Sequence, residues 1–259
     1  MGTITKALEM LNYFSRSAPE LGLSEFVRLS GRDKATVHRH LVELAENGFL
    51  EQHPDSRAYR LGPAILRLAT VRETTAPTRA VVLPLIAALA DEVGELVHFS
   101  LIQGELLSPV AHVEPGRHGT QVHFDPSEML PLHATASGLA VLAFGPRGLR
   151  DRVLAGPLAA HASATVTDGA DLAALVARVR QAGIARAEKS FDDEVTSQAA
   201  PVFGADGVAI GAVSIAVPLG RASDEKCAHY AAALRAGAAR ITEALGGTPA
   251  RDPSQMETT

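Results

Sequence analysis

Residues 34–40 gather hydrogen-bonding side chains within two turns of a helical pattern. Arg39 can present a two-pronged guanidinium to guanine, and Thr36 can donate to a phosphate or contact a thymine methyl group. Ala35 is small enough to allow close approach to base edges. The spacing therefore predicts a surface that reads the major groove of DNA. Its candidate contacts are Lys34, Ala35, Thr36, His38, Arg39 and His40, and Ser24 in the preceding segment is a further candidate DNA contact.

An apolar stripe must hold these side chains in place. At about 100° per residue, Val37, Leu41 and Leu44 share one face of a helix, and the candidate contacts lie mainly on the other side. Asp33 is a suitable N-cap, and the pair at 47–48, Asn-Gly, ends the helix. An ordinary amphipathic surface helix would show the same stripe, so this pattern leaves both interpretations open.

Two helices are predicted before this one. Apolar residues recur at helical spacing over residues 4–14, and Pro19 closes that segment. Ser24 is a suitable N-cap for a short helix that stops at Gly31. A short helix, a tight turn and a second helix give the helix-turn-helix arrangement, which favours DNA binding.

The segment that follows predicts a wing. Residues 49–52 and 58–62 are expected to form two strands around a turn at 53–57. Arg57 at the tip and Arg60 on a strand are positioned to reach a phosphate or the minor groove. A hairpin directly after the helix tips the balance toward a winged helix-turn-helix.

The C-terminal part offers a competing chemistry through its histidines. A metal-binding or enzymatic protein is the alternative hypothesis, carried by His98, His112, His118, His123 and His133. Their spacing matches no zinc motif, Ser137 lacks the flanking glycines of a nucleophile elbow, and no glycine-rich phosphate loop follows a strand. We therefore expect no enzyme activity, no metal and no cofactor.

Composition is consistent with two domains. The chain has 259 residues, 46% of them apolar, and a net charge of −5. Residues 1–75 hold ten Lys and Arg against nine Asp and Glu, so the negative charge belongs to the remainder. A single cysteine excludes an internal disulfide, and no signal peptide or membrane-spanning run is present. We expect a cytoplasmic protein.

Beyond the wing, an amphipathic linker helix is predicted at 63–75, and the boundary to a second domain lies near residue 76. The pattern then alternates strands and helices of an α+β domain with an antiparallel sheet. The predicted strands cover residues 96–102, 105–113, 199–203 and 208–217. The predicted helices cover residues 79–93, 134–144, 149–154, 171–181 and 223–245.

Several motifs in this order resemble one family. They are Gly22–Phe26, Lys34–Leu41, Gly48–Glu51, Tyr59–Pro63, Leu130–Gly138, Ala199–Phe203, Asp206–Gly207 and Gly211–Ser214. Together they resemble the IclR family of bacterial regulators over roughly residues 3–246. The resemblance implies a winged helix-turn-helix at 1–62, a linker helix at 63–76 and a GAF-like effector-binding domain at 77–246. Residues 247–259 are expected to be a disordered tail.

The resemblance also implies an effector pocket at the start of the predicted helix after His133. Backbone N–H groups and hydroxyls at a helix N-terminus suit a carboxylate, so an organic acid or aromatic compound is the expected effector. The implied wall residues are Val122, Phe124, Met129, Thr135, Ala136, Ser137 and Ser197. The family's acidic pocket residue falls at Ala187 or at Glu188, beside the unusual acidic run 192–194. Alternatively, Thr135 and Ser137 only cap the helix.

The expected partners are a double-stranded DNA operator, a small-molecule effector and further copies of the chain. A homodimer, or a dimer of dimers, would place two recognition helices about one DNA turn apart. The sequence leaves open which acid binds, which operator is read and whether transcription is repressed or activated.

Overall fold

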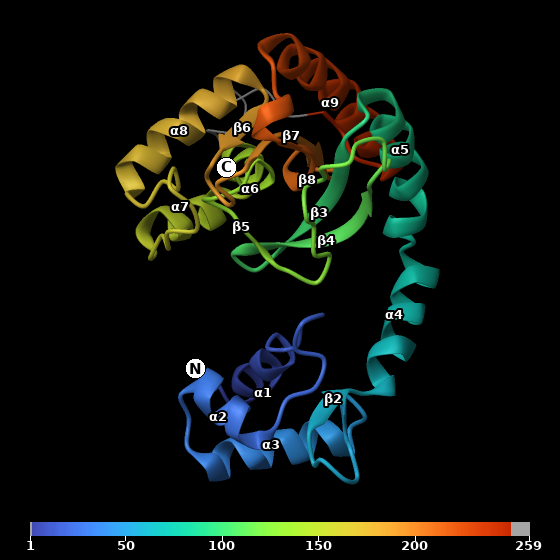
Figure 1. Cartoon of the computed structure of the whole chain (residues 1–259), viewed down its shortest axis with the longest axis vertical. Coiled ribbons are helices and arrows are strands. Elements are labelled where there is room, and N and C mark those ends of the chain that lie inside the picture. Colours follow the sequence, from blue (N-terminus) through green and yellow to red (C-terminus); the bar gives the residue numbers. More distant parts are fainter. Residues whose placement is uncertain (1, 250–259) are drawn as a thin grey trace. The chain divides into compact units, whose positions relative to one another are not determined.

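The computed structural model describes residues 2–249 and divides into two compact units, with the boundary between Pro77 and Thr78 (Figure 1). The predicted tail at 247–259 therefore lies outside the described residues from position 250 onward. Within the described part, no helix is long and apolar enough to cross a membrane.

Unit 1 has a core centred on Phe26, which is fully buried. In chain order its elements are α1 (Thr3–Leu11), α2 (Leu23–Ser30), α3 (Lys34–Glu46), β1 (Leu50–Gln52), β2 (Tyr59–Leu61) and α4 (Pro63–Thr75). The Phe14 and Tyr59 rings meet Phe26 edge-on, at centroid distances of 5.6 and 6.3 Å. Helix α1 ends at Leu11, earlier than predicted, and leaves Phe14 to fill this core.

The helix-turn-helix forms with one correction to the predicted caps. Asp33 caps α3 as expected, since its carboxylate accepts from the Thr36 N–H at 2.9 Å. Helix α2 is capped at Gly22 and not at Ser24, because the Glu25 carboxylate accepts from the Gly22 N–H at 2.8 Å. Ser24 therefore lies exposed inside the first turn of α2.

Unit 2 is an antiparallel sheet covered by helices on both faces. Its described strands run in the order β5-β4-β3-β8-β7-β6. The strands are β3 (Leu96–Gln103), β4 (Leu106–Val113), β5 (Leu130–Pro131), β6 (Ala185–Glu188), β7 (Val195–Phe203) and β8 (Ala209–Pro218). The helices are α5 (Thr78–Val93), α6 (Ala136–Phe144), α7 (Arg147–Ala155), α8 (Gly169–Ala182), a 3-10 turn at Leu219–Arg221 and α9 (Asp224–Ala244).

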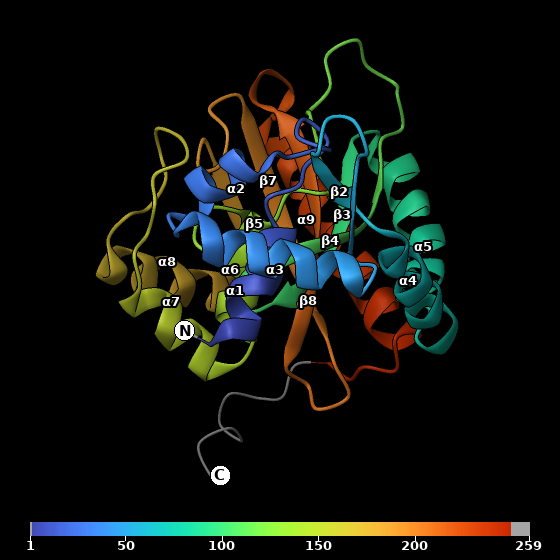
Figure 2. The same ribbon diagram turned by 90° about the horizontal axis from the view of Figure 1, so that it is seen from below.

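The two faces of the sheet have different roles. Helices α5 and α9 cover one face, where Phe99, Val213 and Ile215 belong to a continuous apolar core (Figures 1 and 2). Helix α6 packs on β7 and β8 at the other face, with α7 and α8 outside it. Because side chains alternate along a strand, His98 and Ser214 point to the α6 face.

Gly138 allows α6 to start directly against the chain segment that follows β5. A Cβ atom at this position would lie 2.4 Å from the Leu132 backbone, far inside contact distance. The close approach places the N-terminus of α6 at the edge of a cavity on this face.

Candidate functional site

The predicted recognition face of α3 is exposed. Lys34, Ala35, His38 and Arg39 are open to solvent, and Thr36 is half-buried beside them. On the opposite side, the stripe predicted from the sequence is buried in the core of unit 1. Within residues 2–249, neither Lys34 nor Arg39 has an ion-pair partner, so both cations are available to an anionic surface.

The placement of His40 on this face is wrong. His40 is only 1% exposed, and both its ring nitrogens lack a hydrogen-bond partner among the described residues. His40 lies about 60° from Val37, at the border of the apolar stripe, where packing and not the helical period decides whether a side chain is buried. A buried side chain of this kind cannot contact DNA without rearrangement of α3.

The two wing arginines differ in their interactions with the rest of the protein. Arg60 pairs across the hairpin with Glu51, at 2.6 Å between Nε and Oε1, and the two residues are direct partners in the β1–β2 register. Arg57 is exposed at the tip with a φ of 58°, and its carbonyl accepts from the Gln52 amide at 2.8 Å. Arg57 is therefore the wing residue better placed to reach a phosphate.

Unit 2 contains a cavity of about 370 Å³ between the α6 face of the sheet, the start of α6 and two loops. Of the predicted wall residues, Val122, Phe124, Thr135, Ser137 and Ser197 line it. Ala136 is buried in the core beside it, and Met129 is half-buried outside the lining set.

Glu188 is a further correction. Successive residues of β6 face opposite sides, so Ala187 faces the cavity while Glu188 is exposed and pairs with Arg186 at 3.0 Å. Of the two positions considered for an acidic pocket residue, only Ala187 lines the cavity, and no carboxylate enters the cavity from β6.

Thr135 acts as a helix cap. Its hydroxyl donates to the Pro131 carbonyl at 2.9 Å and accepts from the Gly138 N–H at 3.0 Å. Its proton is thus used within the protein, which supports the capping interpretation for this residue. The Ser137 hydroxyl, 1% exposed, lies 3.4 Å from the Thr135 oxygen and also lines the cavity.

The sequence analysis missed His98 as a cavity residue. Its Nδ1 lies 3.2 Å from the Ser100 hydroxyl, and its ring stacks on Phe124 at a centroid distance of 4.8 Å. Burial, with a smaller contribution from His112, lowers the pKa of His98 to about 4, so the ring is uncharged at neutral pH. Polar residues on an otherwise apolar strand, such as His98 and Ser100, were the signal available in the sequence.

The histidines that carried the alternative hypothesis of a metal-binding or enzymatic protein lie at several places in unit 2. His98 and His112 face each other across β3 and β4, with Phe124 packed against both rings. The Nε2 atom of His133 instead lies 2.9 Å from the Ala159 carbonyl oxygen. In the described part of the chain, no group of three or more His, Cys, Asp or Glu is placed to hold a metal ion.

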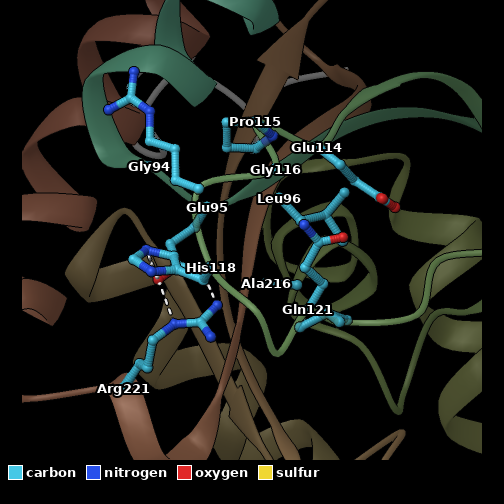
Figure 3. A pocket seen from close by; sticks show the side chains of 12 residues that line it. Gly94, Glu95, Leu96, Glu114, Pro115, Gly116, His118, Gln121, Ala216 and Arg221 are labelled. Atoms are coloured by element: carbon cyan, nitrogen blue, oxygen red, sulfur yellow. Dashed lines mark hydrogen bonds and ion pairs between the residues drawn. The ribbon is translucent and has the colours of Figure 1, made fainter.

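A buried ion pair holds the loop that closes the cavity. Glu95 is 3% exposed and accepts from Arg221 Nε and Nη2 at 2.9 and 2.6 Å (Figure 3). Arg221 Nη1 donates to the Thr120 carbonyl at 2.5 Å, and the carboxylate raises the pKa of the guanidinium. Because the same loop carries Val122 and Phe124 into the cavity wall, Arg221 ties that wall to the end of the sheet.

An exposed helix face followed by a wing, together with a separate unit that encloses a polar cavity, is the organisation of a DNA-binding regulator with a second domain of its own. The comparisons agree: the pattern of the IclR helix-turn-helix domain matches residues 3–54, and that of the bacterial transcriptional regulator IclR C-terminal domain matches residues 74–243. The chain belongs to the IclR family of transcriptional regulators, which are not enzymes.

Similar proteins cover the whole length. A crystal structure of an IclR regulator from Silicibacter sp. TM1040 is 42% identical, with a TM-score of 0.89 over 97% of this chain and 98% of that one. The glycerol operon regulatory protein of Streptomyces griseus is 30% identical over 94% of this chain and 96% of its own length. An IclR homologue from Microbacterium hydrocarbonoxydans, complexed with 4-hydroxybenzoate, is 26% identical, with a TM-score of 0.74 over 94% and 99%.

The Glu95–Arg221 pair gives a stability prediction. We expect Arg221→Met to lower the free energy of unfolding by about 3 kcal/mol, because the buried Glu95 carboxylate then keeps only the more distant His118 Nε2, at 3.8 Å from Oε1. Arg117→Met removes the exposed pair with Asp91, at 3.3 Å, and should cost at most about 1 kcal/mol. Urea denaturation of both variants measures the difference. Equal losses would show that the buried pair does not hold the loop.

Proposed function

We propose that this regulator changes its affinity for an operator when a small carboxylate binds the cavity of unit 2. The observation that carries the proposal is a cavity beside the start of α6 whose wall includes the hydroxyl groups of Ser190 and Ser197. Such a terminus attracts anions through its free N–H groups and the helix dipole. The Thr135 hydroxyl accepts a hydrogen bond from the Gly138 N–H. The backbone N–H groups of Ala136 and Ser137 have no hydrogen-bond partner among the described residues.

A relative supports the class of effector. The Microbacterium hydrocarbonoxydans homologue is complexed with 4-hydroxybenzoate, an aromatic carboxylate. Phe124 and Phe191 give the present cavity apolar aromatic surface, and its volume of about 370 Å³ suits a small ligand. We infer a small organic acid or aromatic acid as effector, with Val122, Ser137 and Ser197 in its wall.

We propose that DNA is read by α3 of two copies of the chain. Lys34, Ala35, Thr36, His38 and Arg39 would face the major groove, and Arg57 a phosphate. Large apolar side chains left exposed on unit 1 support self-association, since such surface normally marks an interface. They include Ile4 and Leu8 on α1, and Leu66 and Val71 on α4, all at least 49% exposed. A homodimer or a dimer of dimers would cover these apolar side chains and supply two copies of α3.

Ligand control then follows from linkage. An effector changes DNA affinity only when it binds one arrangement of the protein better than another. The loop held by Arg221 carries part of the cavity wall. We therefore propose that the effector's contacts with this loop differ between the two arrangements of the protein.

Replacement of Arg39 tests DNA reading. Arg39→Ala should cost about 1–3 kcal/mol of operator binding and relax preference at one base pair of each half-site, because a guanidinium fork is lost. Arg57→Ala should weaken all sequences alike. Operator titrations at fixed salt measure both effects. Unchanged affinity of Arg39→Ala would show that α3 presents another face.

Replacement of Ser137 tests the effector site. Ser137→Asp places a fixed negative charge beside the N-terminus of α6, where it should repel a carboxylate and abolish the response of operator binding to acid effectors. Binding of operator without effector should persist, since α3 belongs to the other unit. Thr167→Asp, at an exposed loop residue, is the control. A full response in Ser137→Asp, with an unaltered thermal transition, would contradict the assignment.

Replacement of Leu66 tests self-association. Leu66 is 73% exposed, so Leu66→Glu should leave the fold of the chain intact and weaken the dimer by at least tenfold through burial of a charge. Leu106→Glu, at an exposed residue of unit 2, should leave the association constant unchanged. Sedimentation velocity over a concentration series distinguishes the two. An unchanged association constant in Leu66→Glu would remove α4 from the interface.

A further inference from the structure

The cavity has an uneven distribution of charge. Its buried wall is polar but uncharged, with Ser137, Ser190 and His98 each no more than 8% exposed. Asp125, Glu128 and Asp192 also line it, and the last two are exposed, so they stand at the solvent side. Among the described lining residues there is no lysine or arginine. A ligand thus meets neutral groups inside and carboxylates at the mouth.

Two polar groups on side chains of this wall have no hydrogen-bond partner in the described part of the chain. Within residues 2–249, the Ser190 hydroxyl makes no hydrogen bond, and His98 is bonded only through Nδ1, to Ser100, which leaves Nε2 unengaged. Buried polar groups are normally paired, so both point to a ligand or water in the cavity. Each suits a hydroxyl or carboxyl oxygen, and neither carries a charge that would neutralise a dianion.

The aromatic side chains restrict the shape of such a ligand. Phe124 is stacked on His98 with an interplanar angle of 26°, and Phe191 packs near His161 with ring centroids 5.3 Å apart. Both phenylalanines line the cavity, one from each loop. Flat apolar surface of this kind favours a ring over a flexible chain.

We propose that the cavity takes an aromatic acid with one carboxylate and an uncharged distal substituent, and that Glu128 and Asp192 exclude dicarboxylates. This inference rests on the proposed function. With one carboxylate at the start of α6, a second on the far side of the ring would approach the mouth. Repulsion there adds to the loss of its hydration, and no lysine or arginine among the described lining residues offsets either effect.

The experiment compares matched para-substituted benzoates on the full chain by calorimetry. The probes are 4-hydroxybenzoate, 4-methylbenzoate and terephthalate, which differ in the distal group. We expect terephthalate to bind the wild type at least tenfold more weakly than 4-hydroxybenzoate. In the Glu128→Gln/Asp192→Asn variant, this gap should shrink severalfold, because removal of the two carboxylates favours the dianion more than it favours either monocarboxylate. Glu194→Gln, an exposed carboxylate outside the lining set, should preserve the gap.

Each result decides between named possibilities. Terephthalate binding as tightly as 4-hydroxybenzoate would overturn the charge filter and leave the proposed acid sensor standing. A gap that persists in the double variant would overturn the assignment to Glu128 and Asp192. If none of the three acids binds, both the filter and the carboxylate effector fail, whereas operator binding by the wild type still tests the DNA-binding role independently.

Discussion

The structure of unit 2 depends on a sheet that must be covered on both faces. Alternation sends Phe99, Val213 and Ile215 to the α5–α9 face, where they are fully buried in a dry core. The same alternation sends His98, Ser197 and Ser214 to the opposite face. Polar groups there would be costly beneath a packed helix, because each buried donor or acceptor needs a partner. A cavity beside α6 resolves the conflict, since a ligand or water can supply those partners.

A buried ion pair can fix the position of a loop, and the loop over this cavity is an example. The desolvation of Glu95 and Arg221 offsets much of their attraction, so the pair adds little net stability compared with apolar residues. Its geometry is nevertheless specific: both carboxylate oxygens are used, and the third nitrogen reaches the Thr120 carbonyl. The loop therefore has one favoured position, and Phe124 is brought onto His98 as a consequence.

The sequence predicts what local periodicity controls. The stripe of α3 and the long strands of unit 2 follow from patterns of 3.6 and 2 residues, whereas the Asp33 cap and the short wing hairpin follow from the residue types at the cap and the turn. Strands β5 and β6 have only two and four residues, too few for a period to be read, and they form because neighbouring strands offer free edges. His40 borders the apolar stripe, so its burial depended on packing that the period alone does not resolve.

The site was harder to predict because hydrogen bonding decides the role of each residue. Thr135 and Ser137 stand two positions apart at one helix start, and both hydroxyls donate within the protein: Thr135 donates to the Pro131 carbonyl, and Ser137 donates to the Thr135 oxygen at 3.4 Å. Ala187 and Glu188 are adjacent, and strand alternation alone determines which one faces the cavity. A tenfold change in operator affinity needs about 1.4 kcal/mol of differential binding, comparable to one hydrogen bond made in only one arrangement. Single hydrogen bonds at this wall would therefore be enough for the proposed regulation, without a large rearrangement of the sheet.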